Sequence, residues 1–296
     1  MSWLVFAISA IVYWVTMEKS ASVWDCPEFI TTFHKLEVGH PPGAPFYMLA
    51  YNAFAELFPA HGDWIAIAGN ALSGLLSGLT ILLLFRTISH LIRRSFILRT
   101  ASWREETEIP ADYAWIALGS ALVGSLTYAF TDTFWYSAVE SEVYAFSSFF
   151  TALVFYLILK WEETRNPIKE DRWLLITAYL MGLSVGVHLL NLLAIPAMAL
   201  VYYFKRTEKA TWKGGVVATL LSFVLVAVIL FGIIPGVPEV AGYFDLFFVN
   251  TLGLSYNSGL ICYVLVLALV MGLTVYASMR RPVPMTLLRV GFLSTC

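Results

Sequence analysis

Long apolar stretches separated by short polar segments run through most of the chain. Stretches of this kind are typical of helices that cross a membrane, which need about 20 mostly apolar residues. Runs suited to membrane spans lie at about 2–17, 64–90, 113–131, 143–160, 173–187, 189–205, 214–234 and 259–279. The pattern therefore predicts an all-α, polytopic bundle of about eight transmembrane helices.

Three of these runs need a closer interpretation. The run at 2–17 is short and lacks a basic flank, so it also fits a signal peptide with a small-residue cleavage site at 20–22. Its residues Trp3, Tyr13 and Trp14 favour a span instead, because aromatic residues collect at membrane interfaces. The runs at 173–187 and 189–205 together exceed one bilayer crossing, which predicts a tight outer hairpin near Gly186.

The composition supports a membrane protein. Hydrophobic residues occupy 59% of the 296 positions and charged residues only 13%, whereas a soluble domain carries about 25% charged residues. The net charge of −2 and the pI of about 6.2 give no support for nucleic-acid binding. We predict a transmembrane domain at 1–281 and a short unstructured tail at 282–296, which suggests a truncated chain.

Charged residues divide unequally between the two sides of the predicted bundle. One side receives 16 of the 18 basic residues, and the positive-inside rule makes that side cytoplasmic. The outer side receives two basic residues, Lys19 and Lys35, but 11 of the 20 acidic residues. The outer acids are therefore the first candidates for chemistry.

The first outer loop combines acids with helix signals. Pro27 suits the first turn of a helix, and residues 27–38 read as a short amphipathic helix on the membrane surface. Its predicted apolar face consists of Phe29, Ile30, Phe33 and Leu36. Pro41 and Pro42 then break the chain, and residues 46–58 form a second apolar helix.

Asp25 and Glu28 in this loop have two interpretations. Asp25 suits the N-cap of the helix and Glu28 its first turn, where a negative charge is favourable. Alternatively, two carboxylates beside Trp24 at a membrane surface have raised pKa values and suit general-base catalysis.

A second acidic segment links the third and fourth predicted spans. Glu140 and Glu142 lie near the membrane boundary, after an aromatic group that includes Trp135. The segment is either a solvated turn with an aromatic belt or the far wall of a cavity shared with Asp25 and Glu28. The sequence alone does not decide between them.

Few residues on the outer side can carry positive charge. Lys35, His40 and His188 are the candidates for binding a phosphate, and Asn191 follows His188 at the predicted hairpin. A histidine at this position also often only bonds to a neighbouring helix. Zinc-protease, CxxC, phosphate-loop and hydrolase-elbow patterns are absent from the sequence, which weakens metal-hydrolase and nucleotide-dependent functions.

Four motifs occur in order across residues 1–205. They are Trp-Asp-Cys-Pro-Glu-Phe at 24–29, Gly-His-Pro-Pro-Gly-Ala-Pro at 39–45, Ala-Val-Glu-Ser-Glu-Val-Tyr at 138–144 and Gly-Leu-Ser-Val-Gly-Val-His at 182–188. This series resembles the membrane family labelled domain of unknown function 2723, whose animal relatives are protein O-mannosyltransferases of the endoplasmic reticulum. Pro27 stands where that family usually has glycine.

The resemblance implies a GT-C-type, inverting glycosyltransferase, here a bacterial inner-membrane protein with a periplasmic active site. Its donor would be a polyprenyl-phosphate-linked mannose or other hexose, and its acceptor a Ser or Thr hydroxyl of a protein. Asp25 would be the catalytic base and Glu28 its partner. Some GT-C relatives use a divalent cation, which Asp25 and Glu142 would hold, and others need no metal. Membrane lipids complete the expected partners.

Other functions are also compatible with the sequence. The same chemistry serves a lipid or glycan acceptor. A transporter would need charged or strongly polar residues within the spans, where Asn70 is the most polar candidate. A non-catalytic scaffold would bind no lipid-linked sugar.

Overall fold

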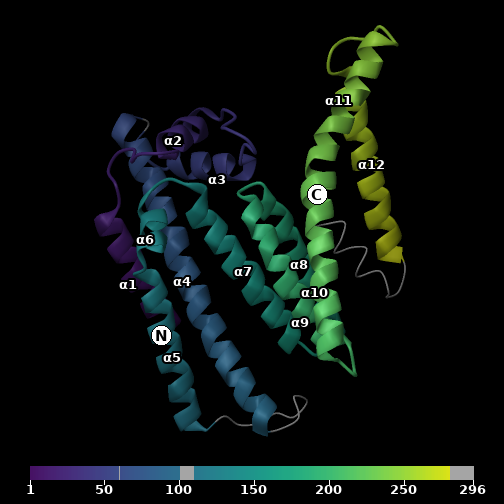
Figure 1. Cartoon of the computed structure of the whole chain (residues 1–296). Helices are drawn as coiled ribbons and strands as arrows, with labels where there is room; N and C mark the ends of the chain where they lie inside the picture. Colours follow the sequence, from purple (N-terminus) through teal and green to yellow (C-terminus); the bar gives the residue numbers. More distant parts are fainter. Residues whose placement is uncertain (60, 101–109, 281–296) are drawn as a thin grey trace. The chain divides into compact units, whose positions relative to one another are not determined.

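The computed structural model describes residues 1–59, 61–100 and 110–280, and the secondary structure of these residues is helical throughout (Figure 1). The α-helices are α1 (Ser2–Thr16), α2 (Cys26–Lys35), α3 (Pro45–Ala55), α4 (Gly62–Thr100), α5 (Ala111–Ala129), α6 (Asp132–Val139), α7 (Val143–Glu163), α8 (Pro167–Val185), α9 (Ala194–Arg206), α10 (Trp212–Val228), α11 (Ile234–Asn250) and α12 (Ser258–Arg280). A 3₁₀-helix (Leu189–Leu193) precedes α9, and a π-helix (Ile229–Ile233) joins α10 to α11. The predicted all-α class is confirmed.

Four helices in the described part of the chain are long and apolar enough to cross a membrane. They are Gly62–Ile97, Val143–Glu163, Leu189–Arg206 and the continuous stretch Trp212–Asn250. A fifth span exists if α5 and α6, which meet at a bend of 66°, form one crossing. Three further apolar helices, Ser2–Thr16, Arg172–Val185 and Ser258–Thr274, are shorter. The count of eight spans and the GT-C-type fold stay predictions.

The chain forms two compact units. The first unit contains Met1–Lys160 and Leu183–Asn191, and the second contains Trp161–Gly182 and the chain from Leu192 onward. Helices α7 and α8 contribute residues to both units. The predicted tail at 282–296 lies outside the described residues, and the division into 1–281 and 282–296 stays a prediction.

The first unit is organised around α4. Helices α1 and α5 both pack against α4, and a buried cluster that includes Val5, Tyr13, Ile81 and Phe134 fills the space between them. The Tyr13 hydroxyl donates a hydrogen bond of 2.8 Å to the carbonyl oxygen of Ala129, which satisfies its polar end inside the core. This packing fixes the end of the bundle at which α2, α3 and the α6–α7 link meet (Figure 1).

Helix α4 is longer than predicted. It has 39 residues and continues past the predicted end at 90 to Thr100, so Arg93 and Arg94 lie on a helix and not in a loop. At 1.5 Å per residue its length is about 58 Å, well beyond the thickness of a bilayer core. Hydropathy marks only the apolar part of a helix, whereas backbone hydrogen bonds continue through its charged end.

In the second unit, α8 and α9 run antiparallel. Glu170 near the start of α8 pairs with two residues at the end of α9, with distances of 2.7 Å to Lys205 and 3.2 Å to Arg206. The Lys205 ammonium also lies 4.3 Å from the ring centre of Trp161. Helix α8 ends at Val185 and α9 begins at Ala194. The chain therefore reverses between them, as the hairpin prediction requires.

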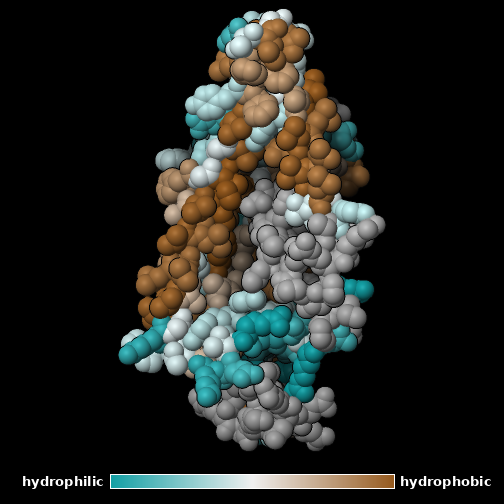
Figure 2. Space-filling view, turned by 90° about the vertical axis from the view of Figure 1, so that its right-hand side faces the viewer, coloured by the Kyte–Doolittle hydropathy of each residue, from teal (hydrophilic) through white to brown (hydrophobic). Residues whose placement is uncertain are grey.

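Helices α10 and α11 form one continuous stretch, whereas a span ending at 234 was predicted. The π-helix ends at Ile233, two residues before Pro235, and Pro238 is inside α11. Proline lacks the N–H group for a helical hydrogen bond, and a π-turn changes the local hydrogen-bond pattern to i→i+5. The helix can therefore continue past the prolines. Large apolar side chains are exposed along this stretch, as Figure 2 shows for this part of the second unit, among them Leu220, Leu221, Val224 and Phe231.

Candidate active site

A cavity of 170 Å³ lies within the first unit and collects residues from four distant segments. Its lining comprises Asp25 and Phe29 from the α2 region, residues 40–44 from the following loop, Glu142, Val143 and Tyr144 at the start of α7, and Val187 and His188 after α8. The structure thus brings Asp25, His40, Glu142 and His188 together. The first and second acidic segments do share a cavity.

Helix α2 leaves the Asp25 carboxylate without a capping role. The backbone oxygen of Asp25 accepts a 3.0 Å hydrogen bond from the Phe29 amide, so residue 25 stands at the helix start. Its side chain makes no capping hydrogen bond. The interpretation of Asp25 as a simple N-cap therefore has no support in this geometry, and the carboxylate lines the cavity instead.

Helix α2 buries part of its predicted apolar face, but it ends at Lys35 and not at the predicted residue 38. Phe29 and Phe33 are buried, whereas Leu36 is 54% exposed. Leu36 adopts the left-handed conformation with φ = 52°, which terminates the helix after Lys35. The apolar spacing continues to residue 36 in the sequence, but the helix does not.

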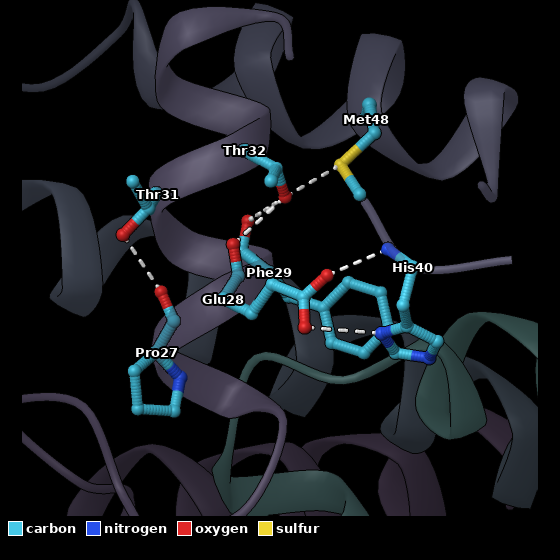
Figure 3. Close-up of polar contacts among 7 residues, drawn as sticks. All are labelled: Pro27, Glu28, Phe29, Thr31, Thr32, His40 and Met48. Atoms are coloured by element: carbon cyan, nitrogen blue, oxygen red, sulfur yellow. Dashed lines mark hydrogen bonds and ion pairs between the residues drawn. The ribbon is translucent and has the colours of Figure 1, made fainter. Parts of the chain in front are cut away.

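Glu28 holds His40 through two hydrogen bonds (Figure 3). One carboxylate oxygen accepts the backbone N–H of His40 at 2.6 Å, and the other lies 3.1 Å from Nδ1 of its ring. The backbone N–H is the main cause of a lowered pKa for Glu28, and the ring contact adds to it. Glu28 is therefore ionised at neutral pH.

The loop that carries His40 is closely fitted to α2. A Cβ atom added at Gly39 would lie 3.2 Å from the Met48 methyl group and 3.3 Å from a Glu28 carboxylate oxygen. On the other side of His40, its carbonyl oxygen accepts the Gly43 amide at 2.9 Å. The backbone of His40 is thus held from both sides.

Gly186 ties the motif at 182–188 to the start of α3. Its carbonyl oxygen accepts the amides of Phe46 and Tyr47 at 2.8 and 3.2 Å, two donors that a helix start leaves unpaired. The contact places Val187 and His188 beside the loop of residues 40–44.

Replacing Gly186 with alanine is expected to destabilise the protein by about 1–3 kcal/mol, the usual cost of overpacking. The added Cβ would lie 2.9 Å from Cβ of Phe46, whose position α3 fixes. Thermal unfolding in detergent measures the effect. Gly119→Ala in α5 is the matched control, because nothing lies within 4 Å of its added Cβ. Equal melting temperatures for both variants would contradict the assignment.

The link between α6 and α7 is held by a buried amide. Ser141 donates a 2.7 Å hydrogen bond to Asn70, whose own amide group donates to the carbonyl oxygens of Glu18 and Ser20. Asn70 is fully buried and has a structural role here. Glu140 accepts a short hydrogen bond from the Ser22 hydroxyl and is not among the cavity-lining residues.

Among the groups that line the cavity, Glu142 has a strongly raised pKa. It is only 5% exposed, and burial raises its pKa from 4.5 to about 7, with further increases from the charges of Glu140 and Asp25. A buried carboxylate with two acidic neighbours holds its proton more strongly than a solvated one. Glu142 therefore exchanges a proton close to neutral pH.

His188 contributes a mostly neutral imidazole to the cavity lining. Burial lowers its pKa, and its ring packs against Tyr144 with centroids 5.5 Å apart. Its Nδ1 accepts the Leu190 amide at 3.2 Å, which leaves the Nε2 position as the hydrogen-bond donor.

Three other predicted site residues do not line the cavity. Lys35 is exposed at the end of α2. The Trp135 indole donates to the Thr16 hydroxyl at 3.2 Å and packs on the core. Asn191 is fully buried and accepts hydrogen bonds from Ser147 and Thr151, both at 2.8 Å. Their predicted binding roles stay predictions.

Sequence reasoning did not single out several lining residues. Phe29, Tyr144 and Val187 supply apolar walls, and Pro41 to Ala44 form one side of the cavity. All of them lie inside the four motifs at 24–29, 39–45, 138–144 and 182–188. The motif boundaries were the available signal, although they did not distinguish wall residues from polar ones.

Asp25, Glu28 and His40 also satisfy the proximity requirement of a metal site. Each offers one ligand atom, and these atoms lie within 4.8 Å of one another. Two carboxylates and an imidazole are suitable donors for a divalent cation such as Mn²⁺ or Zn²⁺. The donor set therefore fits a cation, with Glu28 and His40 in place of the predicted Glu142.

The long apolar helices and this cavity define an integral membrane protein with an acidic site at one end of a helical bundle. Residues 25–211, more than half of the chain, match the family described as protein O-mannosyl-transferase TMEM260 N-terminal domain, and the chain belongs to this family. The match begins at Asp25 and includes all the residues that line the cavity.

Two relatives carry the corresponding name. The chain is 26% identical over 181 residues to protein O-mannosyl-transferase TMEM260 of Mus musculus, covering 61% of this chain and 22% of the relative. It is 21% identical over 236 residues to protein O-mannosyl-transferase tmem260 of Dictyostelium discoideum, covering 75% and 26% respectively. The chain thus matches about a quarter of these relatives. No solved structure matches it.

Proposed function

We propose that this chain is a membrane glycosyltransferase that moves mannose from a polyprenyl-phosphate carrier to a Ser or Thr hydroxyl of a protein. The observation that carries the proposal is the cavity that Asp25 lines together with Glu142, His40 and His188. The Asp25 carboxylate is not used in a capping hydrogen bond to α2. Family membership supports mannose and a protein acceptor, because the two relatives are named protein O-mannosyl-transferases.

In the proposed reaction, Asp25 accepts the proton of the acceptor hydroxyl. The acceptor oxygen then forms a bond to the anomeric carbon while the bond from that carbon to the phosphate oxygen breaks. The phosphate leaves as an anion with both electrons of that bond. Attack from the face opposite the leaving group inverts the anomeric centre.

The leaving phosphate needs positive charge or hydrogen-bond donors. The described lining contains no Lys or Arg, so His40 and His188 are the groups available within it. A divalent cation held by Asp25, Glu28 and His40 would supply further positive charge beside the phosphate. In both cases the carrier phosphate binds beside the imidazoles of the cavity lining.

The proposal places the reaction on the non-cytoplasmic face. The cavity residues all belong to segments that the loop charges assign to the outer side. For a bacterial chain this face is the periplasmic side of the inner membrane. Long apolar helices beside the site would hold the polyprenyl tail within the bilayer.

A transfer assay tests the function directly. Purified chain in lipid nanodiscs is incubated with polyprenyl-phosphate [³H]mannose and a Ser/Thr-rich acceptor protein, and the labelled protein is counted. We expect label on protein that β-elimination releases, as an O-linked sugar requires. Label found only in lipid or glycan would show that the acceptor is of that class. If no fraction contained labelled protein, the proposal would be overturned.

A further inference from the structure

Glu142 lines the cavity without a hydrogen-bond partner from the described part of the chain. The residue is only 5% exposed, and its carboxyl group makes no hydrogen bond or ion pair with a residue that the structure describes. Buried polar side chains are nearly always hydrogen-bonded, because an unpaired one keeps the full cost of leaving water. The exception at Glu142 therefore indicates that its partner is a molecule bound in the cavity.

The groups around Glu142 favour a neutral ligand over an ion. Asp25 and Glu142 both line the cavity and the described lining contains no Lys or Arg, so an anion in contact with Glu142 would be repelled. Among the described residues, the ligand atoms close enough to share a cation belong to Asp25, Glu28 and His40, and not to Glu142. The Glu142 carboxyl group is therefore suited to accept a hydrogen bond from a neutral O–H or N–H group.

The remaining lining suits a sugar ring. Phe29, Pro41, Pro42, Val143 and Val187 provide apolar walls around the few polar groups, the usual composition of a small-molecule site. A sugar ring matches such a lining, because it presents C–H groups on its faces and hydroxyl groups at its edge. The cavity volume of 170 Å³ equals that of about six water molecules at ~30 Å³ each, which is room for one sugar unit and not for a glycan chain.

We propose that Glu142 is a specificity-determining residue whose carboxyl oxygen accepts a hydrogen bond from a hydroxyl group of the transferred sugar. This inference rests on the proposed function, because the sugar is the mannosyl group of the lipid-linked donor. The acceptor side chain brings a single hydroxyl, whose proton the proposed reaction gives to Asp25. Glu142 is therefore left for the sugar, which supplies the hydrogen bond that the described protein residues do not.

Binding of modified donors tests the assignment without requiring turnover. Affinity for the chain in nanodiscs, without acceptor protein, is measured for polyprenyl-phosphate mannose and for analogues that each lack one sugar hydroxyl. We expect at least one analogue to bind the wild type about 10- to 100-fold more weakly, the loss typical of a hydrogen bond to a charged group. Glu142→Met should bind the parent donor more weakly by a similar factor and should not distinguish it from that analogue. Glu142→Gln keeps an acceptor oxygen and should retain part of the discrimination.

Matched controls separate this role from a general loss of charge or fold. Glu37→Met makes the same change at an exposed acid that does not line the cavity, and it should keep the wild-type affinities. Polyprenyl monophosphate lacks the sugar, so it should bind Glu142→Met no more weakly than the wild type. Melting temperatures close to that of the wild type show that the variants are folded.

Three results would overturn the inference. The first is a wild-type chain that binds every analogue as tightly as the parent donor, a result that needs no variant. The second is a folded Glu142→Met chain that discriminates as the wild type does, and the third is an equal loss of affinity for donor and polyprenyl monophosphate. Discrimination that depends on Glu142, in a chain that transfers no sugar to protein, would refute the proposed function and support this site. Transfer to protein without such discrimination would do the reverse.

Discussion

Replacing Asp25 with asparagine is expected to lower the rate of mannosyl transfer by about 10²- to 10⁴-fold, the usual contribution of a general base. Asparagine keeps the size of the side chain but cannot accept the proton of the acceptor hydroxyl at neutral pH. Because Asp25 makes no capping hydrogen bond in α2, the variant should keep its fold. Donor affinity should change much less than the rate.

The control for this experiment is Asp63→Asn, which removes an exposed outer carboxylate from the start of α4. It should transfer mannose at the wild-type rate. The melting temperature of each variant shows whether a lost rate reflects lost protein. Full transfer by a folded Asp25→Asn variant would remove Asp25 from its proposed role as base.

Replacing Glu142 with glutamine is expected to stabilise the protein above pH 7 by about 3 kcal/mol. The folded protein raises the pKa of Glu142 from 4.5 to about 7, so the native state prefers its neutral form. The stability of the wild type relative to a permanently charged Glu142 is fully present below pH 4.5, decreases as the pH rises to 7 and is absent above it. Glutamine resembles the neutral acid and has no such dependence.

Thermal unfolding between pH 4 and 8, with a chelator present, measures this difference. The wild type should lose stability relative to Glu142→Gln across this interval, and the two curves should run parallel above pH 7. Asp63→Asn is the comparison, because Asp63 is an exposed carboxylate at the start of α4 and does not line the cavity. A constant difference between wild type and Glu142→Gln at every pH would contradict a titrating Glu142.

The sequence predicted four residues that line the candidate site, but not its geometry. Loop charges and motifs identified Asp25, His40, Glu142 and His188, yet only tertiary contacts could show that they line one cavity. Those contacts include the hydrogen bonds between the Gly186 carbonyl and the start of α3, and between the Asn70 side chain and Ser141 in the α6–α7 link. Backbone and amide groups of this kind leave no periodic signal in a sequence.

The same distinction applies to the fold. Apolar runs located the long helices because membrane spans need continuous hydrophobicity. They failed at helix ends, where local backbone geometry decides. Leu36 ends α2 through a left-handed conformation, and a π-turn carries α10 past Pro235 into α11. Neither event changes the hydropathy of the segment, so neither could be read from it.

The most direct test of the account is to map where the donor sugar binds. A polyprenyl-phosphate mannose analogue with a photoreactive group on the sugar is crosslinked to the chain in nanodiscs, and the labelled peptides are identified by mass spectrometry. We expect label at residues 25–44, 142–144 and 187–188, and less label when excess natural donor is present. Label confined to α10, α11 or α12 would contradict it.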